Sequence, residues 1–173
     1  MIKSALFEAD KQSFYQKGIF MIESTPTTHA LKPMSGAQLQ AARRAAADRF
    51  YQIGMSYVPE DYTVKFRKSL TGVARGHVRQ IEAPRPVTRK SLYIFLHECA
   101  HAHLHFGGTR LPRHVEELQA EKWAHSKMRE HGIPVPRTMT ERAKKYVARK
   151  IVQAEKRGAK SIDPEARRFA SSR

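Results

Sequence analysis

Hydrophobic and polar positions follow two different periods along the chain, and the change of period divides it into segments. The alanine-rich segment 36–55 repeats its apolar residues at helical spacing, with Ser35 placed as its N-cap. Segments 62–70 and 73–83 alternate apolar and polar residues at every second position, as half-buried strands do. The pattern therefore predicts a helix, then a β-hairpin or small antiparallel sheet that turns at the Thr-Gly pair between the two segments.

Two more helices follow the predicted sheet. Residues 89–106 form an apolar helical segment that Thr88 would cap and a Gly-Gly pair would close. A short connection leads to a second helix over 113–131, where Gly132 and a nearby proline stop the pattern. Residues 89–106 are the more apolar of the two segments, so we expect them to form the central helix of the domain.

The last part of the chain is predicted to be helical and basic. Thr138 and Glu141 have the spacing of a capping box, which would open a helix that continues to about Arg157. Gly158 would end this helix, and Pro164 would occupy the first position of one more short turn.

These elements predict an α+β fold, in which helices pack on a short antiparallel sheet. We divide the chain into an N-terminal arm over 1–34, a domain over 35–158 and a basic C-terminal tail over 159–173. The longest apolar run has five residues, too few for a membrane-spanning helix, and the N-terminus lacks the apolar core of a signal peptide. We therefore expect a cytoplasmic protein without membrane contact.

The charge of the chain adds a partner class to this picture. The 173 residues contain 32 Lys and Arg against 16 Asp and Glu, a formal net charge of +16. Such a balance favours encounters with polyanions such as DNA, RNA or an acidic protein, and the basic helix 139–157 is one candidate surface for nucleic acid. The single cysteine, Cys99, excludes an internal disulfide, and we expect it to be a small packed residue.

The candidate chemistry lies in the central helix, in the motif HExxH. His97 and His101 are four residues apart, so a helix brings both imidazoles to one face, where they can bind one zinc ion. Glu98 flanks the ion without binding it and can accept a proton from zinc-bound water. The alternative is a polar helix whose histidines, including His103 on another face, pair with neighbours or solvent.

Catalytic zinc takes three protein ligands, so a third must come from elsewhere. His105 lies a further turn along the same rigid helix and is too far to join the first two. His114, Glu116, Glu117 and Glu121 remain, and we favour Glu117 because Ala120 and Ala124 would let its helix approach closely. Glu121, one turn further on, is placed to accept a hydrogen bond from a ligand imidazole. A second oxyanion donor is also expected, with four candidates and no preference among them: Tyr93, His114, His125 and Tyr146.

These motifs resemble the ImmA/IrrE group of zinc metallopeptidases. The similarity consists of the helix entered at Thr88, the HExxH motif with His105 four residues beyond it, and "ELQAEKWA" over 117–124. Glu121 stands where relatives usually have Asn or Asp. Over residues 62–130 the resemblance implies a gluzincin-like zincin fold with HExxH on a central helix and the cleft beneath an edge strand. It further implies limited proteolysis, in some members of a DNA-binding repressor, and an association of some relatives with phages or plasmids.

The favoured interpretation is a zinc-dependent endopeptidase acting on a protein partner, with zinc on His97, His101 and Glu117 and with Glu98 activating the zinc-bound water. One alternative is a DNA-associated zinc protease of the SprT type, which would use His114 as its third ligand. Another is a non-catalytic protein of zincin fold that binds nucleic acid or a partner through its basic surface.

Overall fold

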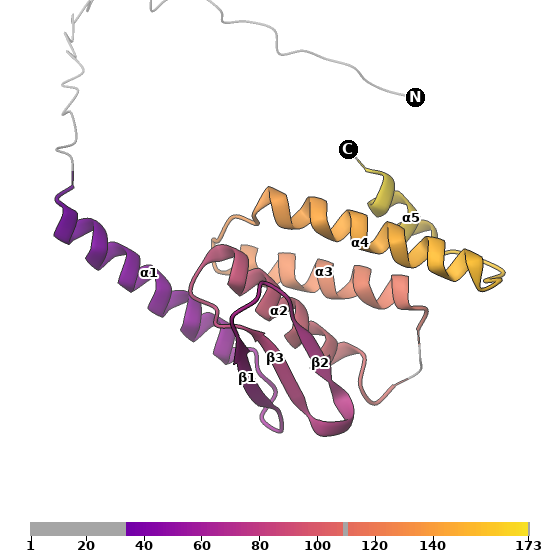
Figure 1. The fold of residues 1–173 in the computed structure, drawn as a ribbon, viewed down its shortest axis with the longest axis horizontal. Coiled ribbons are helices and arrows are strands. Elements are labelled where there is room, and N and C mark those ends of the chain that lie inside the picture. The colour runs from indigo at the N-terminus through magenta and orange to yellow at the C-terminus, as the bar shows by residue number, and fades with distance from the viewer. Residues whose placement is uncertain (1–33, 109–110, 173) are drawn as a thin grey trace, which may run out of the picture. The chain divides into compact units, whose positions relative to one another are not determined.

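A computed structural model describes residues 34–108 and 111–172. The chain divides into two units, Met1–Pro33 and Met34–Arg173, and only the second is described below. The predicted N-terminal arm therefore lies outside the described residues, apart from Met34. The second unit contains five α-helices and a three-stranded sheet, which confirms the α+β class (Figure 1).

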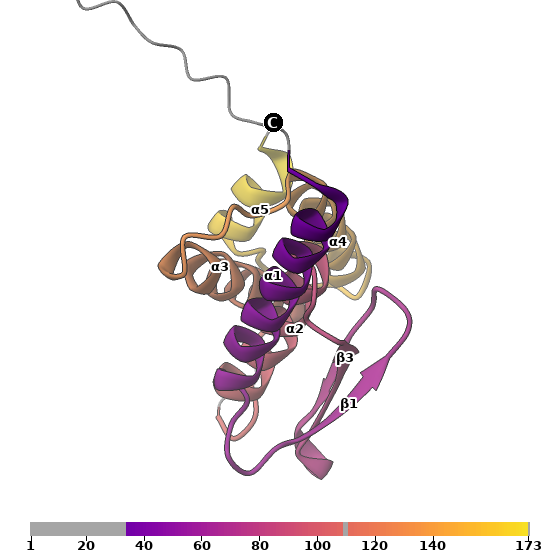
Figure 2. The same cartoon turned by 90° about the vertical axis from the view of Figure 1, so that its left-hand side faces the viewer.

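The first helix, α1 (Gly36–Ser56), begins at the predicted cap. The Ser35 side chain accepts the backbone N–H of Gln38, and the Gln38 side chain accepts the N–H of Ser35, which together form a capping box. Only Ile53 and Gly54 of this helix are buried. The N-terminal turns of α1 therefore lie at the surface of the domain, and its last turns join the core (Figures 1 and 2).

The sheet is mixed, so the prediction of an antiparallel pair formed by 62–70 and 73–83 is wrong. Its strand order is β1 (Thr63–Arg67), β3 (Gln80–Pro84), β2 (Val73–Arg75), with β1 parallel and β2 antiparallel to β3. The reason is a short 3₁₀ turn at Gly76–Val78, followed by Arg79 with a φ of 46°. This turn folds the second segment back on itself, and β1 pairs with the free side of β3 instead.

The central helix is α2 (Arg89–Leu104), which ends two residues before the predicted limit. Thr88 and Ser91 form a reciprocal capping box at its start. Eleven of its 16 residues are buried, because α2 contacts the sheet on one side and α3 on another. The burial fixes α2 on both sides, and such rigidity is what a ligand-bearing helix needs.

Three helices complete the domain: α3 (Arg113–Glu130), α4 (Arg137–Lys156) and α5 (Pro164–Ser171). The predicted capping box at Thr138 is wrong, because the N-cap of α4 is Pro136, two residues earlier, and no side chain caps the helix. The first helical bond there runs from the Thr140 N–H to the carbonyl of Pro136, which places Thr138 inside the helix.

The segment that we assigned to a C-terminal tail contains α5. Pro164 occupies the start of this helix, as predicted, and the Asp163 carboxylate accepts the N–H of Ala166. Ala166 is fully buried against Leu118 of α3 and Val147 of α4. No helix within the described ranges has both the length and the apolar character needed to cross a membrane.

Candidate metal centre

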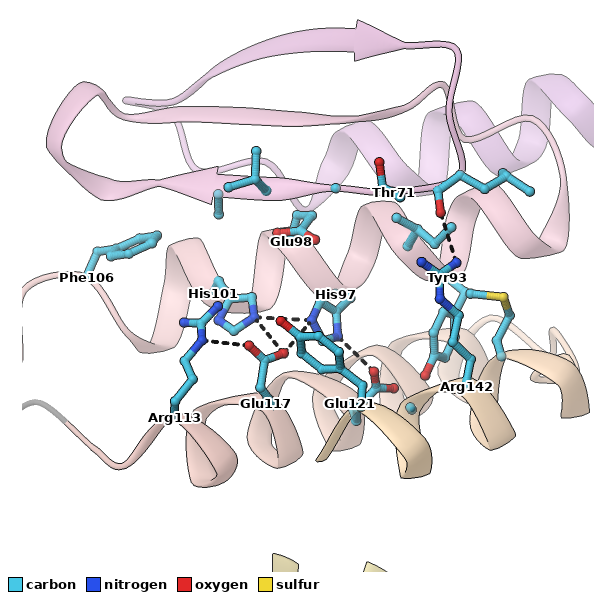
Figure 3. Close-up of a pocket in the computed structure, with 18 residues that line it drawn as sticks. Thr71, Tyr93, His97, Glu98, His101, Phe106, Arg113, Glu117, Glu121 and Arg142 are labelled. Atoms are coloured by element: carbon cyan, nitrogen blue, oxygen red, sulfur yellow. Dashed lines mark hydrogen bonds and ion pairs between the residues drawn. The ribbon is translucent and has the colours of Figure 1, made fainter. Parts of the chain in front are cut away.

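Three donor atoms converge between α2 and α3. The Nε2 atoms of His97 and His101 lie 3.1 Å apart, and Oε2 of Glu117 lies 3.3 Å from the first and 3.6 Å from the second (Figure 3). Tetrahedral coordination with bonds of about 2.0–2.1 Å separates donors by about 3.3–3.4 Å. The triangle therefore has the size of a transition-metal site, and the group could hold a metal ion.

Helical periodicity produces this arrangement from both sides. His97 and His101 are one turn apart on α2, and Glu117 and Glu121 are one turn apart on α3. His101 faces Glu117, and His97 faces Glu121, with 3.1 Å between Nδ1 of His97 and Oε1 of Glu121. The two helices therefore meet as a ladder of facing polar side chains.

Small residues allow the two helices to come this close. Ala100 on α2 and both Ala120 and Ala124 on α3 are fully buried. A side chain longer than a methyl group at these positions would push the helices apart and separate the donor atoms. This is the role that the sequence predicts for Ala120 and Ala124.

Burial sets the protonation of the candidate ligands. Burial lowers the pKa of His101 to about 4, so its imidazole is neutral and available as a ligand at neutral pH. Burial opposes ionisation of Glu117, but hydrogen bonds from His101 and His97 outweigh it and hold the pKa of this carboxyl well below its usual range. Arg113 forms an ion pair with the other carboxylate oxygen of Glu117 at 2.7 Å. The candidate donor set is thus the imidazoles of His97 and His101 and the carboxylate of Glu117.

A polar side chain lies near the outer nitrogen, Nδ1, of each candidate ligand histidine. Oε1 of Glu121 faces His97, and Nδ1 of His105 lies 2.8 Å from Nδ1 of His101. Nε2 of His105 is in turn 3.1 Å from Oε1 of Gln119. We rejected His105 as a ligand and gave it no other role. Its spacing of four residues from His101 was the available signal that it could orient that ring.

Glu98 lies on the other side of the candidate metal position, against the sheet (Figure 3). Its side chain is buried, and its carboxylate accepts a hydrogen bond from the backbone N–H of Ala74 in β2. Gly72 contacts the same side chain so closely that a Cβ there would lie 2.5 Å from Oε1. Burial raises the pKa of Glu98 above its ordinary value, opposed by the charge of His97, which suits a group that accepts and returns a proton.

An open cavity of about 350 Å³ connects these groups to solvent. His97, His101 and Glu117, called the metal group below, form its floor together with Glu98. One wall is Gly72–Ala74 at the edge strand β2, and the opposite wall is α4. Arg142 of α4 donates a hydrogen bond to the carbonyl of Leu70, bridging the two walls at one end. A chain lying in this cavity would pass over the candidate metal position.

Two of the four candidate oxyanion donors, Tyr93 and Tyr146, line this cavity. His125 does not line it and instead packs against the Tyr93 ring. His114 is buried elsewhere, where its Nε2 accepts the backbone N–H of Asp163 at 3.3 Å. Arg113, which the sequence analysis did not consider, lines the cavity beside Glu117. The only sign of this role in the sequence is that Arg113 is four residues before Glu117, which places both side chains on one helical face.

The remaining groups of the motif have packing roles. His103 points away from the metal group, as predicted, with its Nε2 2.9 Å from the carbonyl of Tyr57 and its ring stacked on Trp123. Cys99 is fully buried in the core between α2 and the sheet, and burial raises the pKa of its thiol. A buried thiol of this kind is inert packing, which agrees with the expectation for Cys99.

Comparison of the chain with models of protein families, with curated proteins and with solved structures gives no match.

Proposed function

We propose that the protein is a zinc-dependent endopeptidase that performs limited proteolysis of a protein partner. The observation that carries this proposal is the combination of a His97, His101 and Glu117 donor triangle with a buried carboxylate, Glu98, on the same cavity. Two imidazoles and one carboxylate are the ligand set of several catalytic zinc sites. The same set also occurs in iron oxygenases, but the adjacent buried carboxylate favours hydrolysis.

Zinc bound here would polarise the scissile carbonyl and lower the pKa of a water molecule. Glu98 would accept the proton of that water and later return it to the leaving amine. Its contact with the Ala74 N–H keeps the carboxylate beside the edge strand. Tyr146 and Arg113 also line the cavity, and a carbonyl oxygen that develops negative charge there would find their donors within the same space.

The edge strand supports a polypeptide as the substrate. β2 pairs with β3 on one side only among the described strands, and Gly72–Ala74 turn toward the cavity. An extended peptide can add to such an edge through backbone hydrogen bonds, which position its carbonyl groups without regard to sequence. The resemblance to ImmA/IrrE peptidases favours a DNA-binding regulator as the partner. The net charge of +16 is compatible with a partner that is bound to DNA, because DNA attracts a positively charged protein.

The test compares four variants with the wild-type protein for zinc content and peptidase activity. Glu98→Gln should retain one equivalent of zinc and lose about 10²–10⁴-fold in kcat/KM, because only the proton acceptor is removed. Glu117→Ala should lose or weaken zinc binding, whereas Glu116→Ala on the same helix should retain it. Normal zinc content in Glu117→Ala, together with loss of zinc in His114→Ala, would refute the ligand assignment.

A second experiment identifies the partner. Active protein and Glu98→Gln are expressed separately in the same host, and their proteomes are compared for a protein that is cleaved only by the active form and trapped by the variant. If Glu98→Gln supports every function of the active protein, the site is not catalytic and the proposal is wrong.

A further inference from the structure

A second cavity, of about 320 Å³, lies between the start of α3 and the end of α4. Three basic side chains line it: Arg113 of α3, Lys150 of α4, and Arg157 directly after α4. His114 and Gln153 form part of its wall, and no carboxylate-bearing residue is among those that line it. A concave surface with only one sign of charge concentrates potential and attracts counter-charge.

Two of these three cations keep their charge uncompensated. Arg113 is paired with Glu116 at 2.9 Å and with Glu117 at 2.7 Å. Neither Lys150 nor Arg157 has a carboxylate oxygen within 4.0 Å in the described part of the chain. The ammonium of Lys150 lies 5.0 Å from the ring centroid of Tyr146 instead. The cavity therefore presents about two positive charges.

The wall of the cavity also contains a buried donor without an acceptor. The imidazole of His114 is 2% exposed, and its Nε2 accepts the N–H of Asp163. The proton of the neutral ring must then be on Nδ1. Nδ1 is buried and has no hydrogen-bond partner among the described residues. A buried donor that stays unpaired leaves its partial positive charge uncompensated within the wall of the cavity.

The second cavity shares a lining residue with the candidate active site. Arg113 lines both cavities, and Figure 3 shows it beside His101 and Glu117, at the end opposite Arg142. One face of α4 also lines both cavities, because Tyr146 lines the first and Lys150, one helical turn later, lines the second. A polypeptide that leaves the metal group past His101 would reach the basic cavity next.

We infer that the basic cavity is a subsite for an acidic side chain, Asp or Glu, of the polypeptide substrate, located on one side of the scissile bond. This inference rests on the proposed peptidase function. The cavity has room for one side chain and carries its charge in a hollow. Nucleic-acid backbones instead require several phosphate contacts along a surface, so a peptide carboxylate is the better match.

The experiment uses the zinc-loaded full chain and a peptide library made by chymotryptic digestion of a bacterial proteome, which leaves Asp, Glu, Lys and Arg inside the peptides, with cleavage sites read by mass spectrometry. Wild-type protein should cleave acidic peptides with roughly tenfold higher kcat/KM, the effect of one charge-assisted contact. The enrichment in Asp and Glu should be confined to one side of the bond. The double variant Lys150→Glu/Arg157→Glu should still cleave but should select Lys or Arg at that position.

The matched control is Lys145→Glu/Lys156→Glu, which makes the same charge change on α4 at exposed residues that line neither cavity. It should keep the acidic preference. If wild type cleaves without acidic preference, or the Lys150/Arg157 variant keeps it, the subsite is refuted while the peptidase proposal stands. If wild type cleaves no peptide and Glu98→Gln traps no protein, the proposed function fails and the subsite fails with it.

A second measurement separates peptide from nucleic acid. Binding of a fluorescent DNA duplex is followed by anisotropy for the same two double variants. Equal losses of affinity in both are expected, because each removes the same charge from the surface. A loss at least tenfold greater in the Lys150/Arg157 variant would assign the cavity to phosphate and overturn the inference.

Discussion

Glu121 should make the metal-free protein less stable as the pH rises from 6.5 to 8. Its carboxyl is buried, with one oxygen facing His97 and the other without a partner in the described structure. Burial raises the pKa of Glu121 to about 8, and the charge of Arg142 only partly counters this effect. The folded protein therefore holds a proton at pH 7 that the unfolded chain, with a carboxyl pKa of 4.5, has released.

The sign and size follow from linkage. A pKa raised in the folded state contributes stability that is complete below pH 4.5 and is lost as the pH rises through 8. His101 acts in the opposite direction, because burial lowers its pKa from 6.5 to about 4, but only about 0.4 kcal/mol of its contribution remains to be gained above pH 6.5. Between pH 6.5 and 8 the contribution of Glu121 falls by about 1.5–2 kcal/mol.

The assay is urea unfolding of EDTA-treated protein at both pH values, comparing wild type with Glu121→Gln. The glutamine is neutral throughout and nearly the same size, so the variant should lack the loss caused by Glu121 and keep the pH dependence of His101, which cancels in the comparison. Between pH 6.5 and pH 8, the unfolding free energy of Glu121→Gln should therefore rise by about 1.5–2 kcal/mol relative to that of wild type. Parallel profiles for the two proteins would show that Glu121 is not protonated in the fold, and the argument would fail.

Three further predictions test other parts of the molecule. Gly72→Ala should keep zinc but lower kcat/KM by about 100-fold or more, because the added Cβ displaces the Glu98 carboxylate. The control is Gly36→Ala, whose added Cβ would have no atom within 4 Å. Unchanged activity in Gly72→Ala would contradict the role of Glu98. Leu118→Ala should cost about 2–5 kcal/mol in denaturant unfolding, and a cost below about 1 kcal/mol would mean that α5 does not pack there. Zinc at about 100 times its Kd should stabilise EDTA-treated protein by about 2.7 kcal/mol in thermal unfolding; an equal gain in Glu117→Ala would show that the zinc binds elsewhere.

The metal group could be predicted because it depends on local periodicity. The pairs His97 and His101, and Glu117 and Glu121, are each one helical turn apart, so sequence spacing alone puts each pair on one face. The small residues Ala120 and Ala124 then indicated which face of the second helix approaches the first. Each of these signals lies within one helix, and the long helices were themselves clear from their apolar spacing.

The pairing of the strands could not be predicted in the same way. Alternation marks a strand but does not say which neighbour it takes, because pairing depends on turns and on burial across the sheet. The turn that sets the pairing is Gly76–Val78 with Arg79 after it. The turn predicted from the sequence was instead the Thr-Gly pair before β2. Ile81 and Ala83, both fully buried, mark β3 as the central strand only once the sheet is seen.

The basic cavity is a second feature beyond the reach of the sequence. Its charged residues come from the start of α3 and the end of α4, and neither segment carries a motif. The sequence showed only that the region is basic, which is equally consistent with a solvated surface. Which cations meet in a hollow, and which are paired with carboxylates, depends on the packing of the two helices.

The ladder between α2 and α3 has a consequence for recognising related sites in other chains. Its two rungs, His101 with Glu117 and His97 with Glu121, are set by the register of two antiparallel helices. The number of residues that connect those helices does not enter this register. Insertions or deletions in the connection therefore leave the site intact, whereas a single inserted residue within either helix rotates its partners by about 100° and destroys it. A search for such sites should hold the four-residue spacings constant and leave the interval between the two motifs free.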